Sequence, residues 1–132
     1  MSNKKLGNSF EAEFCDILSK AGFWCHNMAQ NAAGQPADVI AVKEKEAFLI
    51  DCKVCSTGSF QYSRIEDNQD LSMELWRDCG NGCGWFALKF DTDIYMVDRE
   101  SIRNCSERHP AMTAELAEMY GYPLEDWLVY HE

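Results

Sequence analysis

Basic residues are scarce in this chain of 132 residues: 12 lysines and arginines stand against 22 aspartates and glutamates, giving a formal net charge of −10. Proteins that bind nucleic acids usually carry a basic surface, so this balance argues against a uniformly basic binding face. Long apolar runs are also missing, because no stretch approaches the roughly 18 to 20 apolar residues of a membrane span. The first residues lack the apolar core of a signal peptide. We therefore expect a cytoplasmic protein that does not bind a membrane.

The seven cysteines do not form an even set, and the chain has neither internal repeats nor low-complexity linkers. An odd number of scattered cysteines indicates reduced thiols rather than a disulfide framework. The pairs Cys52-x-x-Cys55 and Cys79-x-x-x-Cys83 could supply two halves of a zinc site, although Cys52 is expected to face the core. The length suffices to bury a core without disulfides, so we predict a single domain over residues 1–132.

A strand-like segment near the middle of the chain carries an acid and a lysine. Residues 48–54 have the apolar and β-branched content of a strand. Because successive side chains of a strand point to opposite faces, Asp51 and Lys53 share one face while Ile50 and Cys52 share the other. Asp-x-Lys is a common tripeptide that on most strands forms a solvated ion pair. A buried apolar strand does not normally continue into a carboxylate without a partner, which favours a functional role.

A second predicted strand could place another carboxylate beside Asp51. Residues 37–42 have the pattern of a strand, and the polar residues 43–46 suit a hairpin turn. If the two strands pair, Asp38 near the start of one lies beside Asp51 near the end of the other. Two such carboxylates can hold Mg²⁺ or Mn²⁺, which prefer oxygen ligands. Lys53 could then stabilise charge on a phosphate or help to generate hydroxide from a metal-bound water.

These segments resemble known nucleases in residue type and order. Pro36-Ala37-Asp38 followed by Asp51-Cys52-Lys53 resembles the PD-(D/E)xK nuclease signature, with one alanine inserted after the proline. Gly7-Asn8-Ser9-Phe10-Glu11 is similar to the Gly-x-x-x-Glu at the first helix of archaeal Holliday-junction resolvases and RecU-type resolvases, and residues 84–90 resemble their later core strand. The order and spacing match over about residues 4–98.

The resemblance implies the restriction-endonuclease-like fold, an α/β domain whose mixed β-sheet of about five strands is flanked by helices. The predicted order agrees with this fold: a helix, three strands, a helix and two strands. Residues 99–132 include a predicted helix at 111–120 and an aromatic tail at 124–130. This C-terminal extension has no counterpart that the resemblance identifies.

The resemblance also implies an endodeoxyribonuclease that depends on Mg²⁺ or Mn²⁺. Asp38 and Asp51 would bind the metal together with the main-chain carbonyl of Cys52. Glu11 would complete the coordination shell directly or through water. Lys53 would position the attacking water or steady the pentacovalent phosphorane, and hydrolysis would leave a 5′-phosphate.

Glu11 has a structural alternative. The apolar stripe predicts a helix over residues 9–21 that Asn8 can cap. Glu11 stands three residues after Asn8, where a glutamate can close a capping box. The helical wheel does not distinguish Glu11 from Glu13, because the two flank the stripe on opposite sides. The resemblance selects Glu11 for the site.

Gln69 has a structural alternative too. Ser63-x-x-Glu66 predicts the capping box of a helix that ends near Cys79. Gln69 falls on the apolar side of this helix, one turn before Met73. RecU-type resolvases carry a glutamine in the corresponding helix near the active site, so the resemblance implies a catalytic role. The alternative is a glutamine at the margin of the core.

Candidate DNA contacts come from a polar loop and from the basic residues. In the resembled nucleases, the loop that corresponds to residues 29–35 approaches the scissile backbone. Basic residues gather in the nuclease-like part of the chain and could form a locally basic cleft on an acidic body. The candidates are Gln30, Asn31 and Gln35 in the loop and Lys4, Lys5 and Arg64 among the basic residues.

The resemblance implies a Holliday-junction resolvase of phage or bacterial origin, acting on four-way or other branched DNA in recombination and repair. A resolvase cuts two strands symmetrically, so a homodimer is implied. Exposed apolar residues such as Trp76, Trp85 or Trp127 could form its interface. A nuclease for flaps, ends or specific duplex sites would have the same active site. A catalytically silent protein-binding module would fit the acidic charge and the apolar C-terminus.

Overall fold

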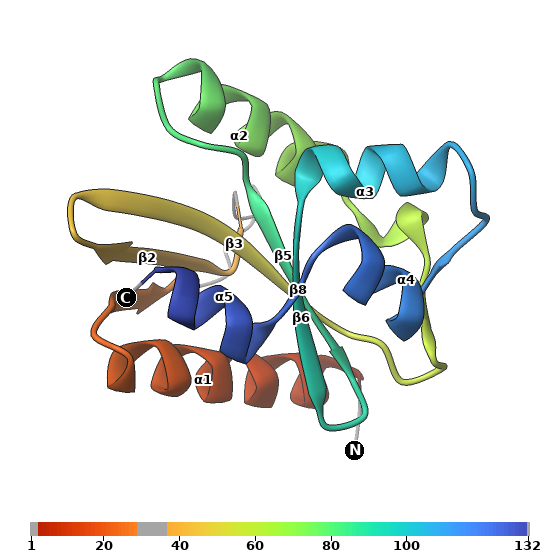
Figure 1. The fold of residues 1–132 in the computed structure, drawn as a ribbon, viewed down its shortest axis with the longest axis horizontal. Coiled ribbons are helices and arrows are strands. Elements are labelled where there is room, and N and C mark those ends of the chain that lie inside the picture. The colour runs from red at the N-terminus through yellow and green to blue at the C-terminus, as the bar shows by residue number, and fades with distance from the viewer. Residues whose placement is uncertain (1–2, 29–36, 132) are drawn as a thin grey trace.

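The computed structural model describes residues 3–28 and 37–131, which form a mixed six-stranded sheet with helices on both faces (Figure 1). The strands follow the order β1-β2-β3-β5-β6-β8; β3 and β5 are parallel, and the other neighbours are antiparallel. The strands are β1 (Trp24–Asn27), β2 (Val39–Lys43), β3 (Glu46–Val54), β5 (Trp85–Phe90), β6 (Asp93–Asp98) and β8 (Tyr122–Pro123). The predicted mixed α/β fold is confirmed, with one strand beyond the expected five because the C-terminal segment supplies β8.

The helices divide between the two faces of the sheet. α1 and α5 pack on one face, and α2, α3 and α4 cover the other together with a small ribbon of β4 and β7 (Figure 1). No helix in the described part of the chain is long and apolar enough to cross a membrane. The remaining elements are α1 (Asn3–Lys20), β4 (Ser59–Phe60), the 3₁₀ turn η1 (Tyr62–Arg64), α2 (Asp67–Asp78), α3 (Arg99–Ser106), β7 (Met112–Thr113), α4 (Ala114–Tyr120) and α5 (Leu124–Tyr130).

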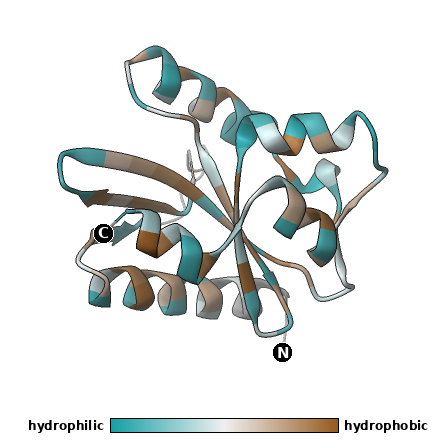
Figure 2. Cartoon of the chain, viewed as in Figure 1, coloured by the Kyte–Doolittle hydropathy of each residue, from teal (hydrophilic) through white to brown (hydrophobic). Residues whose placement is uncertain are grey.

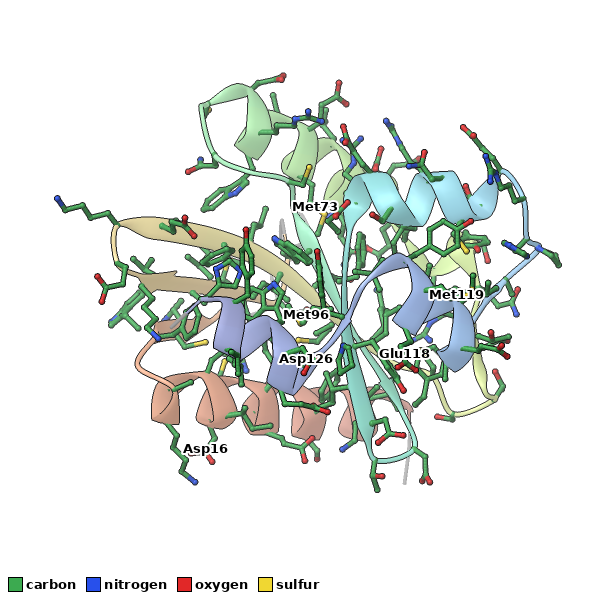
Figure 3. The ribbon with its side chains drawn as sticks, viewed as in Figure 1. Asp16, Met73, Met96, Glu118, Met119 and Asp126 are labelled. Carbon is green, nitrogen blue, oxygen red and sulfur yellow. The ribbon has the colours of Figure 1, made fainter. Side chains whose placement is uncertain are left out.

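The sheet divides the core into two halves, and alternate side chains of a strand point into one half or the other. Ile50 and Cys52 of β3 face the half that contains α1 and α5, whereas Leu49 faces the half that contains α2. Hydrophobic residues accordingly run along β2 and β3 (Figure 2). Met96 belongs to the first half and Met73 of α2 to the second (Figure 3). The predicted division of faces along β3 is therefore confirmed.

A tight hairpin between β2 and β3 sets the register that matters for the site. Glu44 and Lys45 both have positive φ, 53° and 69°, as two-residue turns require when they follow the twist of the paired strands. Val39 then pairs with Ile50. The Asp38 N–H donates to the Ile50 carbonyl at 3.1 Å, which extends the pairing by one residue and sets Asp38 beside Asp51.

The predicted helix starts were wrong at two positions. α1 begins at Asn3, so Asn8 lies inside the helix and is not its N-cap. A helix tolerates an internal glycine such as Gly7 at modest cost, which is why the helix begins earlier than predicted. The N-cap of α2 is Glu66, and its capping box pairs Glu66 with Gln69 rather than with Ser63, because η1 still occupies the residues around Ser63.

The predicted aromatic tail is the helix α5, and its tryptophan is not exposed. Trp127 is 1% exposed; its ring stacks on Phe23 with centroids 5.6 Å apart and meets Phe48 edge-on at 5.2 Å. The prediction that Trp127 lies in an exposed interface was therefore wrong. Trp76 and Trp85 are likewise partly buried against the core. Apolar residues at positions 124, 127 and 128 form the stripe that turns this segment inward.

Candidate active site

Two buried aspartates stand side by side on neighbouring strands. Asp38 immediately precedes β2 and is 6% exposed, and Asp51 lies within β3 with no exposed surface. The Cys52 N–H donates to Asp38 Oδ2 at 2.8 Å, so the Asp38 side chain reaches across to the backbone that follows Asp51. The structure brings the two aspartates together as the hairpin predicts.

Lys53 points to the same face of β3 as Asp51, because side chains two residues apart on a strand share a face. Lys53 Nζ lies 3.1 Å from Asp51 Oδ2. This contact is an ion pair, and Oδ2 receives no hydrogen bond of normal geometry even though it is buried. The lysine side chain is 13% exposed, so its charge acts in a largely dry environment where ion-pair attraction is stronger than in water.

Gln69 joins the first turn of α2 to this pair. Its Nε2 donates to Asp51 Oδ1 at 3.1 Å, while its Oε1 accepts from the Glu66 N–H at 3.3 Å and from Lys53 Nζ at 3.5 Å. Gln69 is 6% exposed. One side chain therefore closes the capping box of α2 and orients Asp51.

Glu11 lies on the buried side of α1 near the aspartates. It is 8% exposed, and burial together with the negative charge of Asp38 raises its pKa to about 7, while the charge of Lys53 opposes the rise. Glu13 instead pairs with Lys89 at 2.7 Å and is 45% exposed. The choice of Glu11 over Glu13 thus agrees with the structure, although Asn8 is not the cap that the structural alternative needed.

The pKa of Asp51 is raised as well. Burial raises its pKa well above the ordinary range, the charge of Asp38 raises it further, and Lys53 lowers it. Crowded carboxylates of this kind repel one another unless a cation or a proton is shared among them. The buried Oδ2 without a hydrogen bond therefore suits a hard cation, which prefers carboxylate and carbonyl oxygens.

The group does not amount to a complete cage of side chains. Among residues 3–28 and 37–131, no set of three or more His, Cys, Asp or Glu side chains is placed to hold a metal ion. Both predicted roles for Glu11, direct ligation of a metal and contact through water, stay predictions. The alternative zinc site is not supported, because Cys52 and Cys55 face opposite halves of the core.

The predicted DNA contacts are placed only in part. Gln30, Asn31 and Gln35 lie outside the described residues, and the side chains of Lys4 and Lys5 are likewise not described. The DNA-contact candidate Arg64 is exposed, and its Nη1 donates to the Val54 carbonyl at 2.8 Å, one residue beyond Lys53. The list of DNA contacts therefore stays a prediction.

Two features of the site were not predicted from the sequence. Glu66 and Gln69 have the three-residue spacing of a capping box. Ser63 and Glu66 have the same spacing, and the sequence prediction placed the capping box on that earlier pair. The hydrogen bond from Arg64 to the end of β3 has no sequence signal, because it joins a side chain to a backbone carbonyl ten residues earlier.

The antiparallel hairpin of β2 and β3 brings two acids and a lysine together, and β3 then pairs in parallel with β5. This arrangement is that of the PD-(D/E)xK nucleases. Within that class, the chain belongs to the archaeal Holliday junction resolvase (Hjc) family, whose family model matches residues 2–130. The match runs through residues 99–130, for which the resemblance had identified no counterpart.

Individual relatives agree with the family. The crossover junction endodeoxyribonuclease Hjc of Methanocaldococcus jannaschii is 28% identical over 94 residues, which cover 71% of this chain and 66% of that protein, just under two thirds of its length. The solved structure of Archaeoglobus fulgidus Hjc, a Holliday junction resolvase from an archaeal hyperthermophile, matches with a TM-score of 0.67 at 16% identity, covering 92% of this chain and 99% of that chain. At that identity the structural likeness shows a shared fold.

Proposed function

We propose that this chain is a metal-dependent, structure-selective endonuclease that cuts Holliday junctions. The observation that carries the proposal is the buried pair Asp38 and Asp51, contacted by Lys53 and Gln69, in a chain of the Hjc family. Burying two neighbouring acids is costly unless they bind something, so packing alone gives no reason for this arrangement.

Asp38, Asp51 and the main-chain carbonyl of Cys52 would hold Mg²⁺ or Mn²⁺, with Glu11 acting directly or through water. A bound divalent cation supplies Lewis-acid stabilisation of the scissile phosphate. Lys53 would position the attacking water and stabilise the negative charge that develops on the phosphate. Gln69 holds Oδ1 of Asp51, which leaves Oδ2 as the oxygen available for the cation.

Because the chain is acidic overall, DNA binding requires a locally basic surface. Exposed acids such as Asp16, Glu118 and Asp126 project from α1, α4 and α5 (Figure 3). Lys53, by contrast, lies near the end of β3, and Arg64 of η1 contacts the Val54 carbonyl at that end. We propose that the DNA backbone follows these basic residues, with weak and strongly salt-dependent affinity because few phosphates are neutralised.

A homodimer in the cell interior is part of the same proposal, because symmetric cutting of a junction requires two active sites. Trp127 is excluded as an interface residue by its burial. Four of the seven large exposed apolar side chains among the described residues lie on α4, β8 and α5 and support an interface in this C-terminal segment. They are Met119 at 72%, Tyr122 at 50%, Val129 at 63% and Tyr130 at 82% exposure.

A competition experiment tests the substrate. Labelled four-way junction, flap and linear duplex would be mixed at equal concentration with the protein, Mg²⁺ and low salt. Preferred cleavage of the junction supports the proposal, and equal cleavage of all three indicates a general nuclease. Absence of cleavage, together with absence of Mn²⁺ binding by calorimetry, would favour the protein-binding module.

A further inference from the structure

Two cysteines from different elements meet on the side of the sheet that α1 covers. The Cys25 thiol donates a hydrogen bond to Cys15 Sγ, and the two sulfurs are 3.4 Å apart. Cys15 lies in α1 and Cys25 in β1, and both are partly exposed to solvent. All seven cysteines are free thiols in this structure.

We propose that Cys15 and Cys25 are a redox-active pair that closes to an intramolecular disulfide when the protein meets a hydroperoxide. The sulfurs are already at hydrogen-bond distance, so bond formation requires them to close from 3.4 Å to about 2 Å. Cys52 and Cys105, by contrast, are buried, which keeps a peroxide away from them.

The hydrogen bond also decides which sulfur reacts first. Cys15 accepts the hydrogen bond, which lowers its pKa, while the same bond and burial raise the pKa of Cys25. The Cys15 thiolate attacks one peroxide oxygen, giving a sulfenic acid and releasing the other oxygen as water after protonation. The Cys25 sulfur then attacks the Cys15 sulfur, and the sulfenic oxygen leaves as water with the Cys25 proton. In total, two thiols and one hydrogen peroxide give one disulfide and two waters.

The crosslink would connect α1, which carries Glu11, to β1, which pairs with β2. Cys15 stands one helical turn after Glu11 in α1. Cys25 stands two residues before Asn27, which pairs with Val39 next to Asp38. A disulfide here therefore fixes α1 against the hairpin that carries the aspartates, without consuming a residue of the site.

Thiol counting and peptide mapping test the proposal without reference to nuclease activity. Reduced protein would be titrated with hydrogen peroxide, alkylated and digested under non-reducing conditions. We expect loss of two alkylatable thiols, a peptide that joins Cys15 to Cys25, and reversal by dithiothreitol. Because the bond closes a short loop of the unfolded chain, oxidation should also raise Tm by roughly 5 °C or more.

Matched variants make the result decisive. Cys15→Ser and Cys25→Ser should each abolish the crosslinked peptide and the rise in Tm, whereas Cys79→Ser, in an exposed cysteine, should retain both. Oxidation that instead joins Cys79 to Cys83, or that leaves Cys15 and Cys25 alkylatable, would overturn the proposal. Neither result bears on whether the protein cuts junctions.

Discussion

Gln69 Nε2 donates a hydrogen bond to Asp51 Oδ1 over 3.1 Å and thereby ties the first turn of α2 to the middle of the sheet. The same side chain accepts from the Glu66 N–H as part of the capping box. Asp51 cannot rotate without losing this donor. The orientation of the buried carboxylate is thus coupled to the start of a helix that contributes no acid to the site.

Replacing Gln69 by glutamate separates its two roles. A glutamate at this position can still accept from the Glu66 N–H, so α2 should remain capped. It cannot donate to Asp51, and it adds a negative charge next to two acids. We expect junction cleavage to fall by about 10²-fold, and the free energy of unfolding to fall by roughly 1 to 3 kcal/mol because the buried Asp51 carboxylate loses its donor. Unchanged cleavage by Gln69→Glu would show that the hydrogen bond to Asp51 has no catalytic importance.

Removing the Lys53 charge should reduce catalysis more than folding. Lys53→Ala loses the cation beside Asp51 Oδ2, and we expect cleavage to fall by about 10² to 10³-fold. Lys20→Ala is the matched control, because Lys20 is exposed and forms an ion pair with Asp16 on the surface. Single-turnover cleavage rates measure both variants, and an equal loss in the control would point to a general charge effect.

Glu11 should make stability fall as the pH rises in metal-free buffer. Its pKa is raised from 4.5 to about 7 in the folded state, so between these values the folded state binds more protons than the unfolded state. The free energy of unfolding therefore decreases with pH across this window. Relative to Glu11→Gln, the wild type should lose stability from about pH 4.5 to pH 7, as measured by denaturant unfolding with EDTA.

Glu13→Gln is the control for this experiment, because Glu13 lies on the same helix but pairs with Lys89 at the surface. It should keep the pH dependence of the wild type. If Glu11→Gln and the wild type showed parallel stability curves over the same window, the placement of Glu11 beside Asp38 would be contradicted.

Trp127 should be essential for the fold, because it is 1% exposed between Phe23 and Phe48. Trp127→Ala should lower the free energy of unfolding by about 3 to 5 kcal/mol through the cavity it leaves. Val129→Ala on the exposed side of α5 should change it by no more than about 0.5 kcal/mol. Urea unfolding of both variants checks the prediction, and a tolerant Trp127→Ala would show that α5 is not part of the core.

The hairpin at the site was predictable because it depends on interactions between residues that are close in the sequence. Alternation along residues 48–54 sets Asp51 and Lys53 on one face, and a two-residue turn at Glu44 and Lys45 fixes the register with Asp38. The helix starts were less predictable, since Asn8 and Ser63 are both good capping residues and the choice among caps depends on the packing that follows.

The long-range features could not be derived from the sequence alone. The contact of Gln69 with Asp51 joins residues 18 apart, and the burial of Trp127 depends on Phe23 and Phe48, far away along the chain. Both arise from packing between elements, for which a single sequence carries only a weak signal. The resemblance to resolvases supplied Glu11 and Gln69 as candidates, which the helical periodicity left open.

The most direct test of the account is cleavage of a labelled four-way junction by the wild type, Asp51→Asn and Asp91→Asn, with Mg²⁺ at low salt. Asp91 is exposed in a turn with φ of 55°, a conformation that asparagine accepts, so Asp91→Asn is a control for the same chemical change away from the site. If Asp51 binds the catalytic metal, the wild type and Asp91→Asn should give paired symmetric nicks, and Asp51→Asn should give none. Equal cleavage by all three proteins would contradict this role of Asp51.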